Sequence, residues 1–340
     1  MRKSNYLILS GLYFDFNDDL SDIENVKESF KNQNIIDLFR FDKIKSIKNI
    51  QVDEENINFI YLPQNIEIID NSAFYKKKII ILDLSNCTKL KTIVSFSFAY
   101  NQIKQLKLPK NIETINHAAF YGNKIKTLDL SKYTKLKSIE SLSFANNQIK
   151  QLKLPKTIEE IKRNAFDDNQ IELLDLSQYI HLKYIGDYSF RSNQIKQLKL
   201  PKNIEEINFC AFDDNQIESL DLSNCINLNI IYEFAFKSNK IKQLKLPINI
   251  IKIEENSFRH NQIEKLDLSI YIKLKNIEKY AFSENPLNEI KILDNVLIEY
   301  DKYFYFFKDP WNTFIKYYND NNKKSGDYIY INNKWQWYPL

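Results

Sequence analysis

The segment Asn101-Gln-Ile-Lys-Gln-Leu-Lys-Leu-Pro109 decides the fold, because it returns along the chain at a constant interval of 46 residues. It recurs unchanged at 147–155 and 193–201, and with one substitution at 239–247. A related segment, Asn123-Lys-Ile-Lys-Thr-Leu-Asp-Leu-Ser131, lies between these copies and divides each interval into parts of 22 and 24 residues. Such a repeat is typical of a solenoid, in which every coil buries its apolar face against its neighbours.

Each copy has the alternation of a short β-strand. Leu106 and Leu108 are expected to point into the core, whereas Gln105 and Lys107 are expected to point to solvent. Pro109 then ends the strand, because proline lacks the amide hydrogen that a sheet needs. The sequence therefore predicts a repeat solenoid with one parallel β-sheet of about 12 short strands and return segments that are irregular or short-helical.

The chain is predicted to consist of three parts. Residues 1–30 do not fit the repeat and are predicted to cap the apolar end of the first coil. Residues 31–304 carry the 46-residue double repeats. Residues 305–340 are rich in aromatic side chains and are predicted to form a C-terminal cap, with an exposed aromatic ligand site as the alternative.

Two kinds of side chain recur once in each half-repeat and are predicted to stack. The phenylalanines form a buried spine, in which truncation to alanine would cost about 3–5 kcal/mol. The asparagine amides can hydrogen-bond the backbone of their own or the next coil. The two sets are Phe74, Phe98, Phe120, Phe144, Phe166, Phe190, Phe212, Phe236, Phe258, Phe282 and Phe304, and Asn101, Asn123, Asn147, Asn169, Asn193, Asn215, Asn239, Asn261 and Asn285.

A third recurring position faces solvent and alternates in charge. It is lysine in one half-repeat and aspartate in the other, as in Asp129 and Lys153. Since neighbouring parallel strands lie about 4.8 Å apart, identical charges would repel, whereas alternation predicts a continuous Asp–Lys ladder. This alternation explains why the true repeat is a double one and not half that length.

The alternation is interrupted at the beginning of the repeat, where we predict a partner-binding site. The two outward rows start as Ile35, Phe59, Ile81 and Asp37, Tyr61, Asp83, and become polar afterwards. A contiguous apolar patch on an exposed strand face is typical of a partner site. An N-terminal cap folded over the patch is the alternative. The predicted binding residues are Ile35, Phe59, Tyr61, Ile81, Gln105 and Lys107.

The sequence predicts no catalytic, cofactor-binding or metal-binding residues. Its four glycines are too scattered for a phosphate-binding loop. His117, His181 and His260 occupy three different positions of the repeat, so they are not expected to converge on one site. With a net charge of +4 and lysines that alternate with acids, we expect neither nucleic-acid nor membrane binding.

Two further patterns have structural explanations that we prefer. Asp167-Asp168 and Asp213-Asp214 could bind calcium, but Arg191 and Lys237 share their row, which favours a surface ion-pair row. Cys87 and Cys225 lie three full repeats apart, and Cys210 occupies another repeat position. No disulfide is therefore expected, because the two Cα atoms of a disulfide lie within about 7 Å.

The segment Leu108-Pro-Lys-Asn-Ile-Glu-Thr-Ile-Asn-His-Ala-Ala-Phe120 and its copies at 154–166 and 200–212 resemble leucine-rich repeat proteins of the BspA-like subfamily. The resemblance implies a curved rod whose parallel sheet has a ligand-binding face, a role in protein recognition or adhesion, and no catalytic residues. The tail at 323–335 is similar to the C-terminal end of that family, which implies a terminal hairpin that turns at Asn332-Asn333.

The function predicted from the sequence is a non-enzymatic scaffold for protein–protein interaction. We expect a monomer that acts in the cytoplasm, or in the cytoplasm of a host cell, with a protein partner of unknown identity. Free cysteines suit such a reducing compartment. The alternative is a secreted or cell-surface adhesin, since residues 1–14 weakly resemble a signal peptide, although no small-x-small cleavage site follows them.

Overall fold

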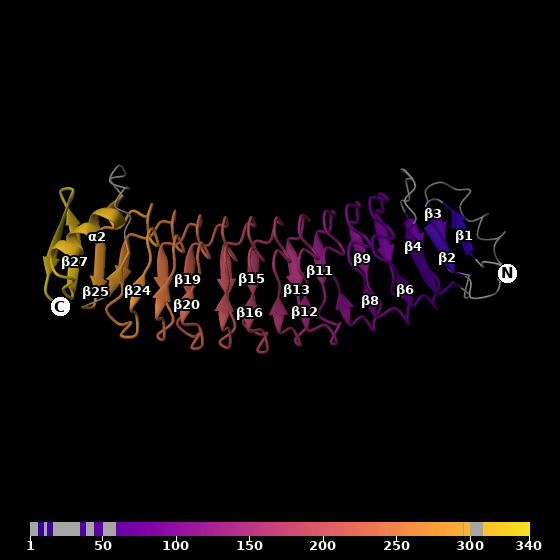
Figure 1. The fold of residues 1–340 in the computed structure, drawn as a ribbon, viewed down its shortest axis with the longest axis horizontal. Helices are drawn as coiled ribbons and strands as arrows, with labels where there is room; N and C mark the ends of the chain where they lie inside the picture. The colour runs from indigo at the N-terminus through magenta and orange to yellow at the C-terminus, as the bar shows by residue number, and fades with distance from the viewer. Residues whose placement is uncertain are drawn as a thin grey trace. The chain divides into compact units, whose positions relative to one another are not determined.

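The computed structural model describes residues 6–9, 12–15, 35–38, 44–49, 59–294, 296–299 and 309–340. The chain divides into two compact units, Met1–Gln170 and Ile171–Leu340. Each unit is a stack of β-coils in which strands of successive coils pair in parallel (Figure 1). The predicted leucine-rich repeat solenoid is confirmed in both units, whereas the boundaries at residues 30 and 304 stay predictions.

The predicted strands form one row in each unit, which we call the long row. Strands β3, β5, β7 and β9 make one parallel sheet of unit 1, and β11 pairs with β13. The strands of unit 1 are β3 (Ile35–Asp37), β5 (Phe59–Tyr61), β7 (Ile81–Asp83), β9 (Gln105–Lys107), β11 (Thr127–Asp129) and β13 (Gln151–Lys153). Those of unit 2 are β15 (Leu173–Asp175), β17 (Gln197–Lys199), β19 (Ser219–Asp221), β21 (Gln243–Lys245), β23 (Lys265–Asp267) and β25 (Glu289–Ile292).

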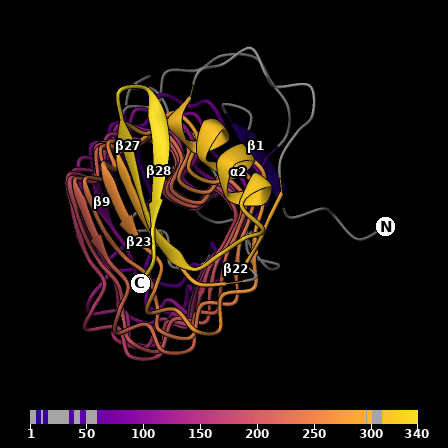
Figure 2. The same cartoon turned by 90° about the vertical axis from the view of Figure 1, so that its left-hand side faces the viewer.

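A second row of strands, the short row, was not predicted from the sequence. It is visible in unit 2, where β22 of the short row and β23 of the long row lie on opposite walls of the coil (Figure 2). Its members in unit 1 are β4 (Ser46–Asn49), β6 (Ile68–Ile69), β8 (Thr92–Ile93), β10 (Thr114–Ile115), β12 (Ser138–Ile139) and β14 (Glu160–Ile161). In unit 2 they are β16 (Tyr184–Ile185), β18 (Glu206–Ile207), β20 (Ile230–Ile231), β22 (Lys252–Ile253), β24 (Asn276–Ile277) and β26 (Leu297–Ile298).

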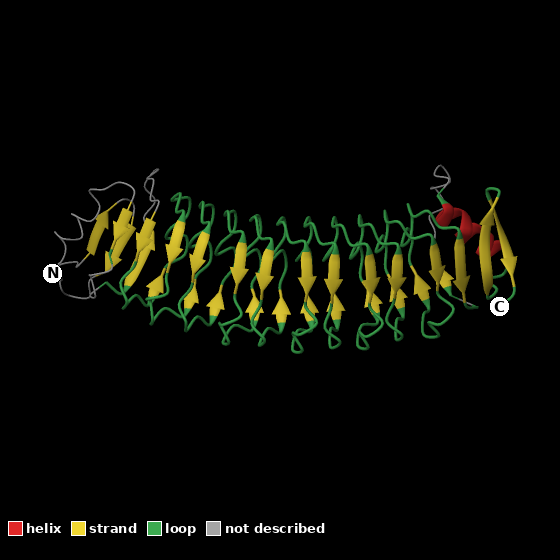
Figure 3. Cartoon of the chain, turned by 180° about the vertical axis from the view of Figure 1, so that it is seen from behind, coloured by secondary structure: helices red, strands yellow, loops and turns green. Residues whose placement is uncertain are grey.

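The return segments consist of these short strands and of turns, and the short helices that we considered there are absent from the described coils (Figure 3). Each turn uses left-handed backbone two residues before and two residues after the spine phenylalanine. Phe96 (φ 56°) and Tyr100 (φ 54°) flank Phe98 in this way. Left-handed backbone is costly for residues other than glycine, so these turns are held by the stacking of the coils.

The core of each unit is a column of parallel phenylalanine rings. In unit 1 the rings from Phe74 to Phe166 stack with centroids 5.2 to 5.9 Å apart. In unit 2 the rings from Phe190 to Phe282 stack at 5.3 to 5.6 Å. All of these phenylalanines are fully buried. Phe304, the last predicted member, lies outside the described residues.

The asparagines form a second buried column beside the phenylalanines. Asn147 shows the pattern: its Oδ1 accepts a hydrogen bond from the amide of Ile125 at 3.1 Å, and its Nδ2 donates to the carbonyl oxygens of Phe120 and Phe144 at 3.0 and 3.2 Å. Asn101, Asn123 and Asn169 bond in the same way. One amide therefore joins the backbones of two successive coils.

Helix α2 (Pro310–Asp320) and the hairpin of β27 (Gly326–Ile331) and β28 (Lys334–Tyr338) close the C-terminal end of unit 2 (Figure 2). The Trp311 ring meets the Phe282 ring edge-on at 5.0 Å, and so ends the phenylalanine column. Phe314, Tyr318, Tyr328 and Trp335 are also buried. These described aromatic side chains pack against one another in the way expected of a cap. Residues 305–307, which carry three more aromatic side chains of the tail, lie outside the described residues.

Four antiparallel strand pairings complete the sheets. β27 pairs with β25 and β28, and the hairpin turns through Asn332 and Asn333, both left-handed. In unit 1, β1 (Tyr6–Leu9) and β2 (Leu12–Asp15) form an antiparallel pair, and β2 also pairs with β4. Residues 16–30 of the predicted N-terminal cap lie outside the described residues.

Candidate partner-binding surface

The register of the first sheet brings the predicted binding residues together. Ile35, Phe59, Ile81 and Gln105 are successive partners from β3 to β9, and Tyr61 and Lys107 lie on either side of Asp83 in the adjacent row. Phe59 and Ile81 are half-buried, Tyr61 is 46% exposed, and Gln105 and Lys107 are exposed. The side chain of Ile35 lies outside the described residues. We call the other five residues the Phe59 patch.

The Phe59 patch lies on the most continuous part of the long row in unit 1. Strands separated by the longer half-repeat pair over their whole length, as β7 with β9 and β11 with β13. Strands separated by the shorter half-repeat generally do not: β9 and β11 belong to different sheets, and β17 meets β19 only at Gln197 and Ser219. β5 and β7 are an exception, because they pair over their whole length across the shorter half-repeat.

The charged row forms separate ion pairs and not the continuous ladder that the sequence predicts. Four lysines of the row meet the aspartate of the preceding long strand, because these two strands pair across the longer half-repeat. The Nζ to Oδ2 distances are 2.8 Å for Lys107–Asp83, 3.8 Å for Lys153–Asp129, 3.5 Å for Lys199–Asp175 and 3.2 Å for Lys245–Asp221. These pairs are exposed, so each contributes little to stability.

Each aspartate of this row has a second role that sequence reasoning missed. Its Oδ1 accepts hydrogen bonds from the amide and hydroxyl of the serine two residues later, at 3.0 and 2.6 Å for Asp129 and Ser131. These bonds, more than Lys153, lower the pKa of Asp129. The signal was present in the sequence, since the aspartate copies read Asp-Leu-Ser where the lysine copies read Lys-Leu-Pro.

The groups that often carry chemistry are dispersed or buried. Burial raises the pKa of Cys87 and Cys210 to about 12 and that of Cys225 to about 11, so none of the thiols is activated. Over the described parts of the chain, no group of three or more His, Cys, Asp or Glu side chains could hold a metal ion. The His117 ring packs edge-on against Phe96 at 5.2 Å.

The acidic row of Asp213 is more buried than the surface ion-pair row that we predicted. Asp213 is half-buried, and burial raises the pKa of its carboxyl although Lys237 and Arg191 oppose the shift. In unit 1, Asp167 is buried, and its Oδ2 accepts a hydrogen bond from Nδ2 of Asn164 at 2.8 Å.

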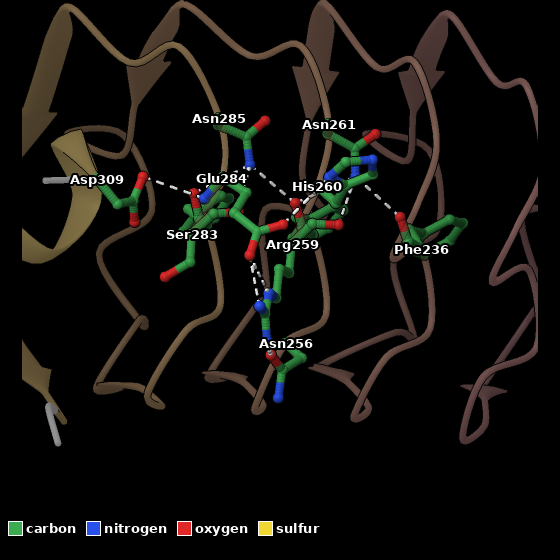
Figure 4. Close-up of polar contacts among 11 residues, drawn as sticks. Phe236, Asn256, Arg259, His260, Asn261, Ser283, Glu284, Asn285 and Asp309 are labelled. Carbon is green, nitrogen blue, oxygen red and sulfur yellow. Dashed lines mark hydrogen bonds and ion pairs between the residues drawn. The ribbon is translucent and has the colours of Figure 1, made fainter. Parts of the chain in front are cut away.

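A polar cluster joins the last coils of unit 2 to the C-terminal cap (Figure 4). Arg259 and His260 both contact the carboxylate of Glu284, with Nε of Arg259 at 3.1 Å and Nδ1 of His260 at 3.1 Å. Arg259 is the main cause of the lowered pKa of Glu284. The amide of Glu284 donates to Oδ1 of Asp309, which precedes α2, at 3.1 Å. The cluster therefore has a structural role.

Exposed isoleucines in unit 2 were also missed. Six of them lie in the loops that join a long strand to the short strand that follows it: Ile180, Ile226, Ile248, Ile251, Ile270 and Ile272. The signal in the sequence is a change of residue type within the repeat. Ile251, for example, replaces the glutamate of the equivalent position 205, and Ile248 replaces the lysine of position 202.

Comparisons with known proteins agree with this repeat. The family model of the BspA type leucine rich repeat region matches residues 22–135, 130–229 and 183–309. No curated protein sequence matches the chain. Among solved structures, a leucine rich cell surface protein from Faecalibacterium prausnitzii is similar, with 13% identity, coverage of 94% of this chain and 98% of the other, and a TM-score of 0.44.

A leucine-rich repeat protein from Bacteroides ovatus is similar at 16% identity, with coverage of 86% of this chain and 90% of the other, and a TM-score of 0.48. The pneumococcal vaccine antigen PcpA is similar at 13% identity, with coverage of 88% and 86% and a TM-score of 0.44. The family assignment rests on the family model, which matches most of the chain. The chain belongs to the BspA-type leucine-rich repeat family.

Proposed function

We propose that this chain is a non-enzymatic recognition protein that binds a protein partner through the Phe59 patch. One observation carries the proposal: the register places Phe59 beside Ile81 and leaves Tyr61 exposed, at the one end of the charged row where an aromatic residue replaces lysine. Exposed apolar side chains that are contiguous and have a polar rim are typical of partner sites. Gln105 and Lys107 supply that rim.

The strand geometry makes the patch a suitable anchor. Full-length strand pairing from β3 to β9 holds the patch on a rigid sheet, so little side-chain and backbone ordering would oppose association. Tyrosine is enriched at interface positions that dominate binding energy, because its ring is large and its hydroxyl can still hydrogen-bond. We therefore expect Tyr61 to contribute most.

The proposed location is the cell surface or the extracellular space, in place of the cytoplasm expected from the sequence. Proteins of the BspA-type repeat family are generally surface or interaction proteins, and the family gives no support to a cytoplasmic role. No described helix is both long and apolar enough to cross a bilayer. Mass spectrometry of the mature N-terminus tests export: removal of roughly the first 20 residues would support it, and an intact Met1 would contradict it.

The binding site can be tested by giving β5 the polar residues that the equivalent strands of later coils carry. Phe59→Gln combined with Tyr61→Lys gives this strand the residues that occupy the same positions at Gln105 and Lys107. We expect the double variant to lose the partner captured from the native source by the wild type, while its Tm changes by less than about 3 °C.

The matched control is Gln151→Ala combined with Lys153→Ala, at the same positions of β13, which should leave capture unchanged. Equal capture by the wild type and the variant with Phe59→Gln and Tyr61→Lys would refute the site. A large loss of Tm would mean that Phe59 and Tyr61 stabilise the fold and do not form a free surface.

A further inference from the structure

An open cleft with a volume of about 620 Å³ lies in unit 2, on the side of the short row. It is formed by consecutive coils and is distinct from the Phe59 patch, which belongs to unit 1. Its lining includes Glu205, Glu206, Ile226, Tyr232, Ile251 and Lys273.

The cleft begins where a second row of ion pairs ends. This row lies just before the short strands and alternates between glutamate and lysine. Its pairs include Lys91–Glu113 at 3.6 Å and Lys137–Glu159 at 2.9 Å in unit 1, and Lys183–Glu205 at 2.8 Å in unit 2. The next two members are Asn229 and Ile251.

The backbone shows that these two residues are true equivalents of a charged pair. The amide of Ile251 donates to the carbonyl of Asn229 at 2.8 Å, as the amide of Glu205 donates to the carbonyl of Lys183 at 2.9 Å. The coil is therefore unchanged while both charges are lost. Shorter, uncharged side chains leave the space that the ion pair would fill.

The middle of the cleft presents aliphatic side chains to solvent. Ile226 is 55% exposed and Ile251 is 40% exposed, and Ile272, next to Lys273, is 79% exposed. Asn249 connects their coils, because its Nδ2 donates to the carbonyl of Ile226 and its Oδ1 accepts from Nζ of Lys273, both at 2.9 Å. Aliphatic exposure that continues over adjacent coils is typical of an interaction surface.

One end of the cleft has an excess of negative charge. Glu206 lies at this end of the cleft with Tyr232, and its side chain is half-buried. Burial and then the charges of Glu206 and Glu254 raise the pKa of Tyr232. The nearby cation, Lys252, is already bound by Glu254 at 3.0 Å and Glu278 at 2.6 Å. A cation brought to Glu206 would therefore meet an uncompensated field.

We propose that this cleft binds an extended polypeptide segment of a partner protein, in which a lysine or arginine is flanked by aliphatic side chains. The aliphatic side chains pack against Ile226 and Ile251, and the cation pairs with Glu206 beside Tyr232. Charge complementarity selects this occupant, because Glu206 would attract the cation and repel an acidic segment. Glu205 does not add to this selection, since it is already paired with Lys183. The proposal adds a second binding surface to the protein and does not rest on the Phe59 patch.

The test uses the full chain and two fluorescein-labelled peptides, Leu-Lys-Leu-Lys-Leu and Leu-Glu-Leu-Glu-Leu, in fluorescence anisotropy titrations. A variant with Asn229→Lys and Ile251→Glu carries the residues of positions 183 and 205 and should fill the cleft. We call it the filled variant. We expect the wild type to bind the basic peptide and not the acidic one, and the filled variant to bind the basic peptide at least about tenfold more weakly.

Glu206→Gln separates the charge from the apolar contact. It should weaken binding of the basic peptide about three- to fivefold, and this difference should shrink as salt is added. The matched control makes the reverse exchange in unit 1, Lys137→Asn combined with Glu159→Ile, and should leave peptide binding unchanged.

Any of three results of the peptide titrations would overturn the proposal. These are equal affinity for the two peptides, no binding of the basic peptide up to about 1 mM, and full binding by the filled variant. A wild-type dimer that dissociates in the filled variant, measured by sedimentation equilibrium, would show that a second copy occupies the cleft and would also overturn it. Phe59→Gln with Tyr61→Lys should not change peptide binding, so failure here is distinguishable from failure of the Phe59 patch.

Discussion

Asn123 shows how one side chain can serve two coils. It is 5% exposed. Its Oδ1 accepts from the amide of Ile103 at 3.0 Å, and its Nδ2 donates to the carbonyls of Phe98 and Phe120 at 2.9 and 3.1 Å. Without this side chain, the buried amide of Ile103 would lose its partner. The carbonyls of Phe98 and Phe120 would each keep one hydrogen bond, from Asn101 and Asn147.

Asn123→Ala should therefore destabilise the protein by about 2–4 kcal/mol, since it removes several buried hydrogen bonds at once. Urea unfolding measures the change. The control is Asn111→Ala, which removes an exposed amide with one long hydrogen bond to the carbonyl of Thr88, 3.3 Å, and should cost less than about 1 kcal/mol. Equal effects of the two changes would contradict the role of the buried column.

Asp129 makes the protein sensitive to acid. Its pKa is lowered chiefly by Ser131, and to a lesser degree by Lys153. Because the folded carboxyl has the lower pKa, its contribution to stability is complete above the unfolded pKa of about 4 and is lost as pH falls through the folded pKa.

Ser131→Ala should raise the pKa of Asp129 by more than Lys153→Ala does, in a carboxyl ¹³C NMR titration. Asp175 and Ser177 form the same arrangement and provide an internal reference in each variant. A larger effect of the lysine change would mean that the ion pair, and not the turn hydrogen bonds, controls this carboxyl.

At the residue scale, the sequence could predict which side chains are buried, but it could not predict the left-handed turns. The alternation of Leu106 and Lys107 follows from strand geometry. The usual signal for left-handed backbone is glycine, and these positions are occupied by residues such as Leu142 (φ 59°) and Ser238 (φ 54°), with Gly122 (φ 68°) as an exception. The stacking of the coils imposes left-handed backbone on residues that would otherwise favour right-handed backbone.

At the element scale, α2 closes the end of unit 2 through one side chain. Trp311 is fully buried between Phe282 and Phe314, at centroid distances of 5.0 and 5.5 Å. The column of rings needs such a cover, because its last phenylalanine would otherwise expose a whole face to water.

Trp311→Ala should cost about 3–5 kcal/mol, and hydrogen exchange should increase first in the coil that contains Phe282. Tyr338→Ala, at an exposed position of β28, is the control and should change stability by less than about 0.5 kcal/mol. Unchanged exchange near Phe282 in the tryptophan variant would mean that α2 does not cap the column.

The long row could be predicted because each strand has clear alternation and a proline or serine boundary. The short row could not, since a strand as short as β18 has no period to detect. The sequence also could not predict that long strands separated by the longer half-repeat pair in twos, which we call doublets. This pairing depends on the unequal lengths of the two half-repeats, whose effect on strand separation is a property of the packed coil.

At the scale of the whole molecule, the three thiols are protected by the fold. Burial raises the pKa of Cys87, Cys210 and Cys225 to between about 11 and about 12. Iodoacetamide near pH 8 should therefore leave all three unmodified in the native protein and modify all three in urea, as read by mass spectrometry. Rapid alkylation of any one in the native state would show local opening of its coil.

The two candidate surfaces differ in how easily they can be recognised from the sequence. The Phe59 patch is visible as a break in a regular charged row, and the structure brings its residues side by side. The unit 2 cleft also lies where a regular charged row is interrupted, in this case the row of glutamates and lysines. Recognising it requires knowing that Asn229 and Ile251 are neighbours on adjacent coils. That adjacency comes from the short row, which the sequence does not reveal.

The strand doublets also limit how the gene of such a protein can change in length. Each doublet from that of β7 and β9 onward contains one aspartate strand and one lysine strand, as in β19 and β21. Duplication or deletion of one double repeat adds or removes a whole doublet and keeps every ion pair and serine-capped turn. A single half-repeat would instead bring two aspartates or two lysines together. Lineages of this protein should therefore differ by even numbers of coils, each step copying one doublet.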